Sequence, residues 1–366
     1  MSEGFRVLVL GGYGHFGGRI SRALSADPSI DLTIAGRDAA RAGAFAAPLG
    51  ASAVGIDHRS AGFAQRLAEI RPDLLIHAAG PFQGQDYSVA EASIAAGVHY
   101  VDLADGRAFV CGIDRLDARA RERGVLVVSG ASTLPAVSSA IVDALCGAVP
   151  GLERIEISIA PAQRIPRGEA TLAAVLTYCG KPLTRLEDGR WRTVRGWQAI
   201  RRHAYRTLGT RWMAACDVPD LDLFPRRYPG LRTVTFDAAL ELWPLQWGMW
   251  LMAAVSRLGL VRDWSRYAGQ LRRLAALFDH FGSDRGGMQV RLRAPSGGVD
   301  CELMAPDGRG PEIPAIPAVI LARKLAAGRL AARGVTPCMG LFSLDEFREA
   351  VADLGIGWWI DESPPR

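Results

Sequence analysis

FRVLVLGGYGHFGGRI, at residues 5–20, joins a short apolar run to a glycine-rich turn and the beginning of a helical pattern. The run at 5–10 is rich in β-forming residues and shows no polar alternation, which is typical of a parallel strand buried on both faces. The turn contains GxGxxG at Gly12, Gly14 and Gly17. There the first glycine permits a tight turn, the second lets a diphosphate approach the backbone, and the third lets helix and strand pack closely. The stretch predicts the first βαβ unit of a dinucleotide-binding domain.

Tyr13, His15 and Phe16 stand between these glycines, so we expect their backbone amides to lie beside the phosphates. The alternative is a glycine-rich turn without a ligand. The loop also fits GxxGxxG, which is typical of short-chain dehydrogenases. Those enzymes need a tyrosine four residues before a lysine, and the sequence contains no such pair.

Strand and helix patterns alternate from this loop to about residue 130. The predicted strands are 31–35, 52–56, 73–78, 98–103 and 124–129, and the predicted helices are 15–26, 38–48, 60–70, 85–96 and 108–123. Such alternation predicts right-handed βαβ crossovers and an α/β fold with a doubly wound parallel sheet, a Rossmann domain.

The pattern changes near residue 150, where longer strands with alternating polarity begin. They are 154–160, 231–237, 287–294 and 299–304, and Ser296-Gly297-Gly298 is predicted to be the hairpin turn between the last two. These strands predict an α+β second domain with an antiparallel sheet. We therefore expect a nucleotide-binding domain at 1–134 and a substrate and dimerisation domain at 135–310. We expect residues 311–366 to pack back on the first domain, beginning with a helix at 312–330.

Composition excludes several classes of protein. The formal net charge is +5 over 366 residues, and the arginines are scattered, so nucleic-acid binding is not expected. The six cysteines are far apart and form no cluster with histidine, which argues against a zinc site, any other metal site and a disulfide framework. No secretory signal precedes the first strand, so a cytoplasmic protein is expected.

The end of the second predicted strand indicates which nucleotide is bound. An NAD enzyme usually has an acidic residue about 20 residues after the glycines, to bind the ribose 2′-hydroxyl. Here Arg37 occupies that corner, followed by Asp38. A guanidinium there suits a 2′-phosphate, so NADP(H) is the predicted cofactor. The alternative is that Arg37 is a surface residue at a helix start.

Several segments resemble the saccharopine dehydrogenase-like group of NADP-binding oxidoreductases. They are GGYGHFGGRI, AGRD, HAAGPFQGQDYSVAEASIAAGVHYVDLADGRAFV and VVSGASTLPAVSSAIVD. The resemblance covers most of residues 5–143 and is weaker beyond residue 150. It implies NADP-linked redox chemistry more strongly than it implies saccharopine as the substrate.

Loops at the carboxyl ends of the predicted strands supply the remaining candidates, because ligands bind at that edge of a doubly wound sheet. The predicted cofactor contacts are Asp57, Ala79, Gly80, Pro81, Phe82 and Gly130. Asp57 is equally consistent with a helix cap, and the turn at 80–82 with a plain tight turn. Asp102 and Asp105 are the preferred proton donors for a hydride transfer, although an aspartate at a strand end is often only an N-cap.

Arg164, Arg167 and Thr171 are candidates for holding a substrate carboxylate, and a solvated loop is the alternative. The reaction predicted is NADP(H)-dependent hydride transfer to or from a C=N, C=O or C=C bond of a small molecule. Two other functions stay open. A non-catalytic NADP(H)-binding regulator would need no proton donor, and a membrane-peripheral protein would use the segment discussed next.

Tryptophans recur at helical spacing within residues 240–260, at Trp243, Trp247 and Trp250. Pro244 and several polar residues interrupt the segment, which makes a membrane span unlikely from the sequence pattern. A buried or homodimer-forming helix is the favoured interpretation. Peripheral contact with lipid is the alternative.

Overall fold

The computed structural model describes residues 4–165 and 168–363. The chain divides into two compact units. The first comprises the residues up to Val137 together with Pro311–Ala350, and the second comprises Ser138–Gly310 together with the residues from Val351 onward. The expectation that 311–366 packs as a whole on the first domain is wrong for its last part. Strand β16 (Gly357–Ser363) pairs with a strand of the second unit, because its backbone completes the edge of that sheet.

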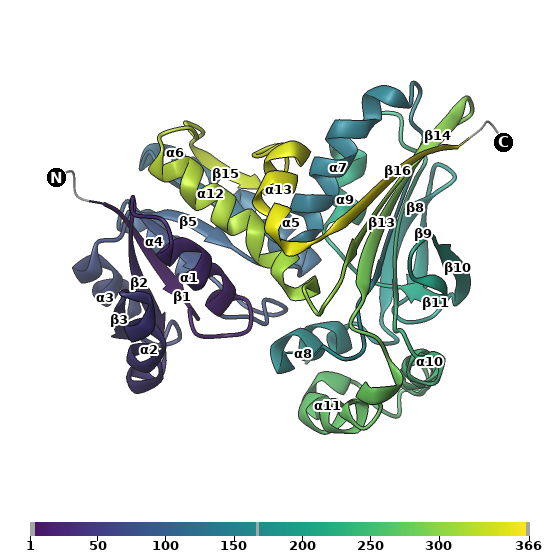
Figure 1. Ribbon diagram of the computed structural model, residues 1–366, viewed down its shortest axis with the longest axis horizontal. Helices are drawn as coiled ribbons and strands as arrows, with labels where there is room; N and C mark the ends of the chain where they lie inside the picture. Colours follow the sequence, from purple (N-terminus) through teal and green to yellow (C-terminus); the bar gives the residue numbers. More distant parts are fainter. Residues whose placement is uncertain (1–3, 166–167, 364–366) are drawn as a thin grey trace. The chain divides into compact units, whose positions relative to one another are not determined.

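The first unit is built on a seven-stranded sheet in which all adjacent strands are parallel, in the order β15-β6-β5-β4-β1-β2-β3 (Figure 1). In chain order the strands are β1 (Phe5–Leu10), β2 (Ile30–Gly36), β3 (Ser52–Gly55), β4 (Leu74–His77), β5 (His99–Asp102), β6 (Leu126–Ser129) and β15 (Gly334–Pro337). The doubly wound parallel sheet predicted from the sequence is confirmed. The edge strand β15 was not predicted.

Up to β6 the helices of this unit follow the predicted alternation, whereas the helix at 344–350 was not predicted. The helices are α1 (Gly17–Ser25), α2 (Ala39–Ala46), α3 (Phe63–Ile70), α4 (Ser88–Ala95), α5 (Arg107–Gly112), α6 (Asp117–Glu122), α12 (Ile316–Ala326) and α13 (Leu344–Ala350). The helix predicted at 108–123 is two helices, because a 3₁₀ turn at Ile113–Leu116 separates α5 from α6. The helix predicted at 312–330 is shorter, since a 3₁₀ segment precedes α12.

Apolar burial explains why β1 lies at the centre of this sheet. Residues Val7 to Leu10 are at most 1% exposed, as expected for a strand covered on both faces. Helix α1 packs its buried Ile20 and Leu24 toward the sheet, and α12 packs against α1. The result holds the carboxyl ends of β1, β2 and β4 side by side, where the glycine loop begins.

The second unit is built on a nine-stranded mixed sheet. Its main order is β10-β11-β12-β7-β13-β14-β16, and β8 and β9 extend from β12. The strands besides β16 are β7 (Arg154–Ala160), β8 (Pro182–Glu187), β9 (Arg190–Arg195), β10 (Arg201–Tyr205), β11 (Gly209–Ala215), β12 (Thr233–Ala239), β13 (Gly286–Ala294) and β14 (Gly297–Ala305). The helices are α7 (Ser138–Leu145), α8 (Glu169–Thr177), α9 (Asp220–Arg227), α10 (Trp243–Arg257) and α11 (Ala268–Ala276).

Two details of the predicted antiparallel arrangement are wrong. Strands β7 and β12 pair in parallel, which the alternation of polar and apolar residues does not distinguish from an antiparallel pair. The hairpin between β13 and β14 turns at Pro295 and Ser296, because Ala294 pairs with Gly297. Gly297 and Gly298 therefore lie within β14 and not in the turn.

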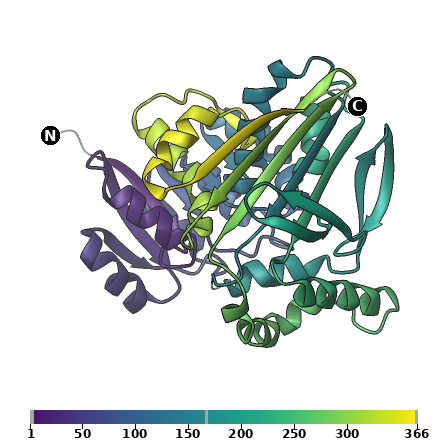
Figure 2. The ribbon, with the colours of Figure 1, turned by 45° about the vertical axis from the view of Figure 1, so that its right-hand side comes forward.

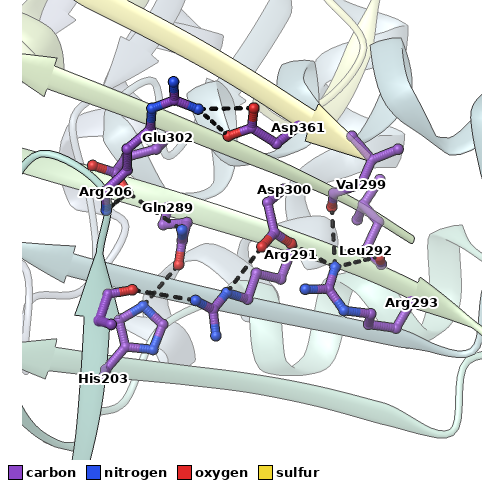
Figure 3. Close-up of polar contacts among 11 residues, drawn as sticks. His203, Arg206, Gln289, Arg291, Leu292, Arg293, Val299, Asp300, Glu302 and Asp361 are labelled. Carbon is purple, nitrogen blue, oxygen red and sulfur yellow. Dashed lines mark hydrogen bonds and ion pairs between the residues drawn. The ribbon is translucent and has the colours of Figure 1, made fainter. Parts of the chain in front are cut away.

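The β10–β11 hairpin lies across one face of this sheet, as Figure 2 shows. His203 on β10 is hydrogen-bonded to Gln289 on β13, with 2.7 Å between Nε2 and Oε1, although β10 and β13 are not neighbours in the sheet order. The buried Glu302 of β14 accepts a hydrogen bond of 2.8 Å from the amide of Arg206 (Figure 3). It accepts a second bond of 2.8 Å from the amide of Thr207. These bonds satisfy a carboxylate that would otherwise be costly to bury, and they fix the hairpin over the sheet.

Candidate functional site

The glycine loop is tied to the end of β2 by its first two amides. Gly11 and Gly12 both donate to the carbonyl oxygen of Ala35, at 2.8 and 3.1 Å. The amide of Gly14 donates to the carbonyl of Gly11 at 2.8 Å, which closes the turn. In the described structure the amides of Tyr13, His15 and Phe16 donate to no backbone carbonyl. The loop therefore presents free N–H groups at the N-terminus of α1, where the helix dipole favours an anion.

Close backbone contacts require glycine at the positions of the motif. A Cβ at Gly12 would lie 2.8 Å from the carbonyl oxygen of Val9, and one at Gly17 would lie 2.2 Å from that of Gly11. A Cβ at Gly14 would lie 3.0 Å from the same Gly11 oxygen. The loop is thus packed for a close helix–strand approach. These features fit a nucleotide diphosphate.

Tyr13 joins the glycine loop to the corner after β2. Its ring lies so near Gly36 that a Cβ there would be 2.3 Å from Cε1 of the tyrosine. The amide of Asp38 donates to the Tyr13 hydroxyl at 3.1 Å, and the Arg41 guanidinium lies over the ring, 5.1 Å from its centroid. Sequence reasoning missed the roles of Gly36 and Arg41. The available signal in the sequence was the glycine directly before Arg37, which leaves room for a neighbouring ring.

Arg37 is exposed at this corner, and within the described residues its side chain makes no hydrogen bond or ion pair. The neighbouring Asp38 forms no ion pair with it among the described residues, and its carboxylate caps α2 by accepting from the Arg41 amide at 3.0 Å. The residue after β3 lies beside the end of β2, because the amide of Ile56 donates to the Gly36 carbonyl at 2.9 Å. An unpaired guanidinium beside the glycine loop is available for an anion.

Asp57 follows β3 at the same edge of the sheet. Its carboxylate accepts from the Arg59 amide at 3.0 Å and so stabilises a turn. The same oxygen, Oδ1, lies 4.0 Å from Nδ1 of His58. Helix α3 begins later, at Phe63, so Asp57 is a turn residue and not the helix cap considered from the sequence.

The turn after β4 lies directly beside the glycine loop. A Cβ at Gly11 would be 3.0 Å from the amide nitrogen of Ala79. The side chain of Gln85 holds this turn by donating to the carbonyls of Ala79 and Pro81, at 3.1 and 2.7 Å. Phe82 is buried, and its ring centroid lies 5.0 Å from that of His77. The predicted wall at residues 79–82 is thus a fixed turn next to the loop, with Gly80 and Pro81 partly exposed.

His77 forms the floor below that turn. Its Nδ1 is hydrogen-bonded to the Tyr100 hydroxyl at 3.1 Å, whereas its buried Nε2 has no hydrogen-bond partner in the described structure. Burial lowers the pKa of His77 to about 3, with a smaller contribution from His58. The imidazole is therefore neutral at physiological pH and is not a proton donor there.

Asp102, at the end of β5, is fully buried and organises two loops. Its Oδ1 accepts from the amides of Ala104 and Gly130, at 2.9 and 2.8 Å, and from the Ser129 hydroxyl at 3.0 Å. Burial raises the pKa of Asp102 to about 6, against the lowering effect of these hydrogen bonds. The contacts fit a residue that holds the ends of β5 and β6 together.

The predicted cofactor residue Gly130 has its amide engaged by Asp102. Its φ of 82° lies in the left-handed region, and a Cβ would be 2.6 Å from Cδ of Pro135. Glycine is required there by the turn after β6.

Asp105 lies in the loop after β5 and is only partly covered. Its Oδ1 accepts from the side-chain amide of Gln83 at 3.0 Å, which joins the loops after β4 and β5. Burial raises the pKa of Asp105, and the Gln83 hydrogen bond opposes that change. Sequence reasoning did not identify Gln83. Its position directly after Phe82 in a strand-end loop was the only signal.

The substrate candidates belong to the second unit. Arg164 is an exposed residue after β7, with its amide donating to the Ser283 carbonyl at 3.0 Å, and Thr171 lies in the first half of α8. Arg167 lies outside the described residues. No ligand set of three or more His, Cys, Asp or Glu side chains gathers among the residues described. In the same part of the chain, no helix is long and apolar enough to cross a bilayer.

Comparisons with known proteins agree with this architecture. No curated protein sequence matches the chain significantly. The structure aligns with apo saccharopine dehydrogenase (L-Glu forming) from Saccharomyces cerevisiae with a TM-score of 0.70, at 14% identity over 98% of this chain and 100% of that chain. It aligns with homospermidine synthase from Legionella pneumophila, solved with NAD, with a TM-score of 0.66, at 10% identity over 97% and 91% of the two chains. At these identities the alignments establish the fold alone.

A family model gives more specific evidence for the first unit. Residues 7–128 match the saccharopine dehydrogenase NADP binding domain, and this range contains the glycine loop, Arg37 and the turns after β4 and β5. The resemblance noted from the sequence is thereby confirmed. Residues 7–128 of this chain thus match the saccharopine dehydrogenase NADP binding domain, and the chain as a whole has a fold similar to that of saccharopine dehydrogenase.

Proposed function

We propose that this protein is an NADP(H)-dependent oxidoreductase that transfers a hydride to or from a C=N, C=O or C=C bond of a small molecule. One observation carries the proposal. The glycine loop offers free amides at the start of α1, and the unpaired guanidinium of Arg37 lies at the adjacent end of β2. The loop amides suit a diphosphate, and the guanidinium suits a 2′-phosphate.

The residues around the loop have distinct roles in this proposal. The amides of Tyr13, His15 and Phe16 bind the diphosphate, and Arg37 binds the 2′-phosphate. Asp57 borders the adenine side, the turn at 79–82 forms a wall, and Gly130 after β6 is a further contact. The nicotinamide supplies or accepts the hydride when the nucleotide is bound.

Asp105 is the proton donor that we propose for the reduction of a carbonyl or imine. It is partly exposed, burial favours its protonated form, and Gln83 fixes its orientation. Asp102 is a positioning residue in this scheme, because its Oδ1 is occupied by three donors. Arg164, Arg167 and Thr171 stay candidates for binding a substrate carboxylate, and the homodimer stays a prediction.

Replacement of Arg37 tests the cofactor preference. Arg37→Ala is expected to weaken NADPH binding by roughly 10- to 100-fold, since a hydrogen bond to a charged group contributes about 1.5–3 kcal/mol. NADH affinity should change little. Arg123→Ala is the matched control, because Arg123 is an exposed arginine at the end of α6, where the chain enters the amino end of β6. An unchanged preference for NADPH in Arg37→Ala would refute the assignment.

Measurement of turnover distinguishes the proposed enzyme from the alternative of a non-catalytic NADP(H)-binding regulator. NADPH oxidation is measured with a panel of imines, ketones and enones, with and without Asp105→Asn. The proposal predicts turnover of at least one class and its loss in the variant. Tight NADPH binding without turnover of any class would favour the regulator.

A further inference from the structure

Helices α10 and α11 display large apolar side chains to solvent. On α10, Trp243, Trp247 and Leu251 follow each other at spacings of four residues, and all three are exposed. This spacing places them on one face, whereas the buried Gln246, Met249 and Ala253 lie on the other. The arrangement is inverted relative to an ordinary surface helix, whose apolar face is buried.

The apolar surface continues beyond α10. Leu258 is 74% exposed, and Leu260, two residues later, is 73% exposed. After α11 begins, Leu274, Leu277 and Phe281 are exposed at spacings of three and four residues. We call the exposed side chains of Trp243–Phe281 the α10–α11 surface. The two helices lie at the same end of the second unit, and Figures 1 and 2 both show them there.

The framework beneath this surface is fixed. The Trp264 indole donates to the Met252 carbonyl at 3.0 Å, which ties the connection between the helices to α10. The Trp247 ring lies 5.6 Å from that of Trp212 on β11. Helix α11 packs on α8. The exposed face is therefore presented by an ordered scaffold.

Exposed arginines occur in the same stretch of the chain as the exposed apolar side chains. The segment 243–281 contains five arginines and two aspartates. The arginines are Arg257, Arg262, Arg266, Arg272 and Arg273. All five are exposed, and in the described structure none forms an ion pair with a carboxylate. Asp263 caps a 3₁₀ turn by accepting from the Ser265 amide, and Asp279 accepts from the Gln163 side chain. Glu169 of α8 is the further carboxylate close to α11.

We propose that the α10–α11 surface docks on an anionic phospholipid bilayer as a peripheral contact. Tryptophan, leucine and phenylalanine side chains enter the interfacial region, and the unpaired arginines meet lipid phosphates. The positive charge also argues against a second copy of this chain as the occupant, since an isologous contact would bring the same arginines together. No helix is long enough to span the bilayer in the described structure, which fits an interfacial position.

Vesicle flotation with the full chain tests this inference. We expect binding to phosphatidylcholine vesicles that contain phosphatidylglycerol, weaker binding to phosphatidylcholine alone, and a decrease in high salt. Arg272→Gln/Arg273→Gln should lower binding by roughly 30-fold, from the usual contribution of an arginine near an anionic surface. Arg190→Gln/Arg226→Gln is the matched control on exposed arginines elsewhere in the second unit and should bind normally.

The apolar contribution is tested by Leu251→Gln/Leu258→Gln/Leu277→Gln. This variant should bind roughly 100-fold more weakly or worse, because each leucine loses burial in the lipid. These side chains are exposed, so folding should be preserved, and circular dichroism checks this. Ile360→Gln, at an exposed apolar residue of β16, is the control.

Absence of wild-type binding to the anionic vesicles would overturn the proposal, as would equal losses in the controls. Light scattering is measured in parallel. A wild-type dimer that becomes a monomer in the triple-leucine variant, without vesicle binding by either, would assign this surface to a protein interface instead.

Discussion

Substitution of Gly17 by alanine is the sharpest perturbation of the glycine loop. The added Cβ would lie 2.2 Å from the Gly11 carbonyl oxygen, 2.8 Å from its carbon and 3.0 Å from Cα of Gly12. All three are backbone atoms, so no flexible side chain can yield, and α1 must move away from the loop. Overpacking of this kind costs about 1–3 kcal/mol. For a unit of this size, each kcal/mol lowers Tm by about 2–4 °C.

The same displacement should weaken nucleotide binding, because the free amides at the start of α1 move with the helix. Thermal unfolding and NADPH titration by fluorescence measure the two effects. Gly43→Ala is the matched control on α2, where a Cβ would meet no atom within 4 Å. It should raise the stability by about 0.4–1 kcal/mol and leave NADPH affinity unchanged. A Gly17→Ala protein with wild-type Tm and affinity would refute the reasoning.

Three further predictions concern the carboxyl groups of the buried Asp102 and the partly exposed Asp105. Burial raises the pKa of Asp102 to about 6, above about 3.9 in an unfolded chain, so its stabilising contribution is full below pH ~4 and is lost as pH rises through about 6. The difference between the free energies of unfolding of the wild type and Asp102→Asn should therefore change by about 3 kcal/mol across this pH interval. Parallel pH profiles of the two proteins would contradict the raised pKa of Asp102. Asp105 must be protonated to donate a proton, so the rate of reductive turnover should fall as the pH rises above its raised pKa. Asp105→Asn should lower turnover by about 100-fold or more and should remove this high-pH fall from the pH–rate profile. The Gln83 hydrogen bond stabilises the carboxylate of Asp105, so Gln83→Leu should raise the pKa of Asp105 and shift this fall to higher pH. A fall at the same pH would rule out Asp105 oriented by Gln83 as the proton donor.

The first unit was largely predictable because its signals are local. Each buried strand is a short apolar run, and the glycine motif follows β1 directly. The contacts that shape the site were not predictable in the same way. The approach of Tyr13 to Gly36 and the bond between Gln83 and Asp105 join loops that only the sheet brings together.

The second unit was predicted less completely. Strands β8, β9, β10 and β11 were missed, and β9 gave a weak signal because its sequence, RWRTVR at 190–195, is mostly exposed and arginine-rich. A signal was present between β8 and β9, since Asp188 and Gly189 both have positive φ in a two-residue hairpin turn. Asp-Gly is the favoured sequence for such a turn. The parallel pairing of β7 with β12 had no local signal, because it joins segments far apart in the chain.

For the tryptophan segment the sequence favoured a buried or dimer-forming helix. The structure contradicts burial of the face of Trp243 and Trp247 within the chain, and a dimer-forming helix stays a prediction. Helical spacing showed that Trp243 and Trp247 share a face, but periodicity does not state whether that face is buried. The structure exposes it, with Trp243 at 66%.

Equilibrium titration of the wild-type protein with NADPH and with NADH tests the central claim most directly. The free loop amides and the unpaired Arg37 guanidinium predict saturable binding of both nucleotides, with NADPH bound at least roughly tenfold more tightly. Binding of neither nucleotide, or equal affinity for the two, would contradict the account.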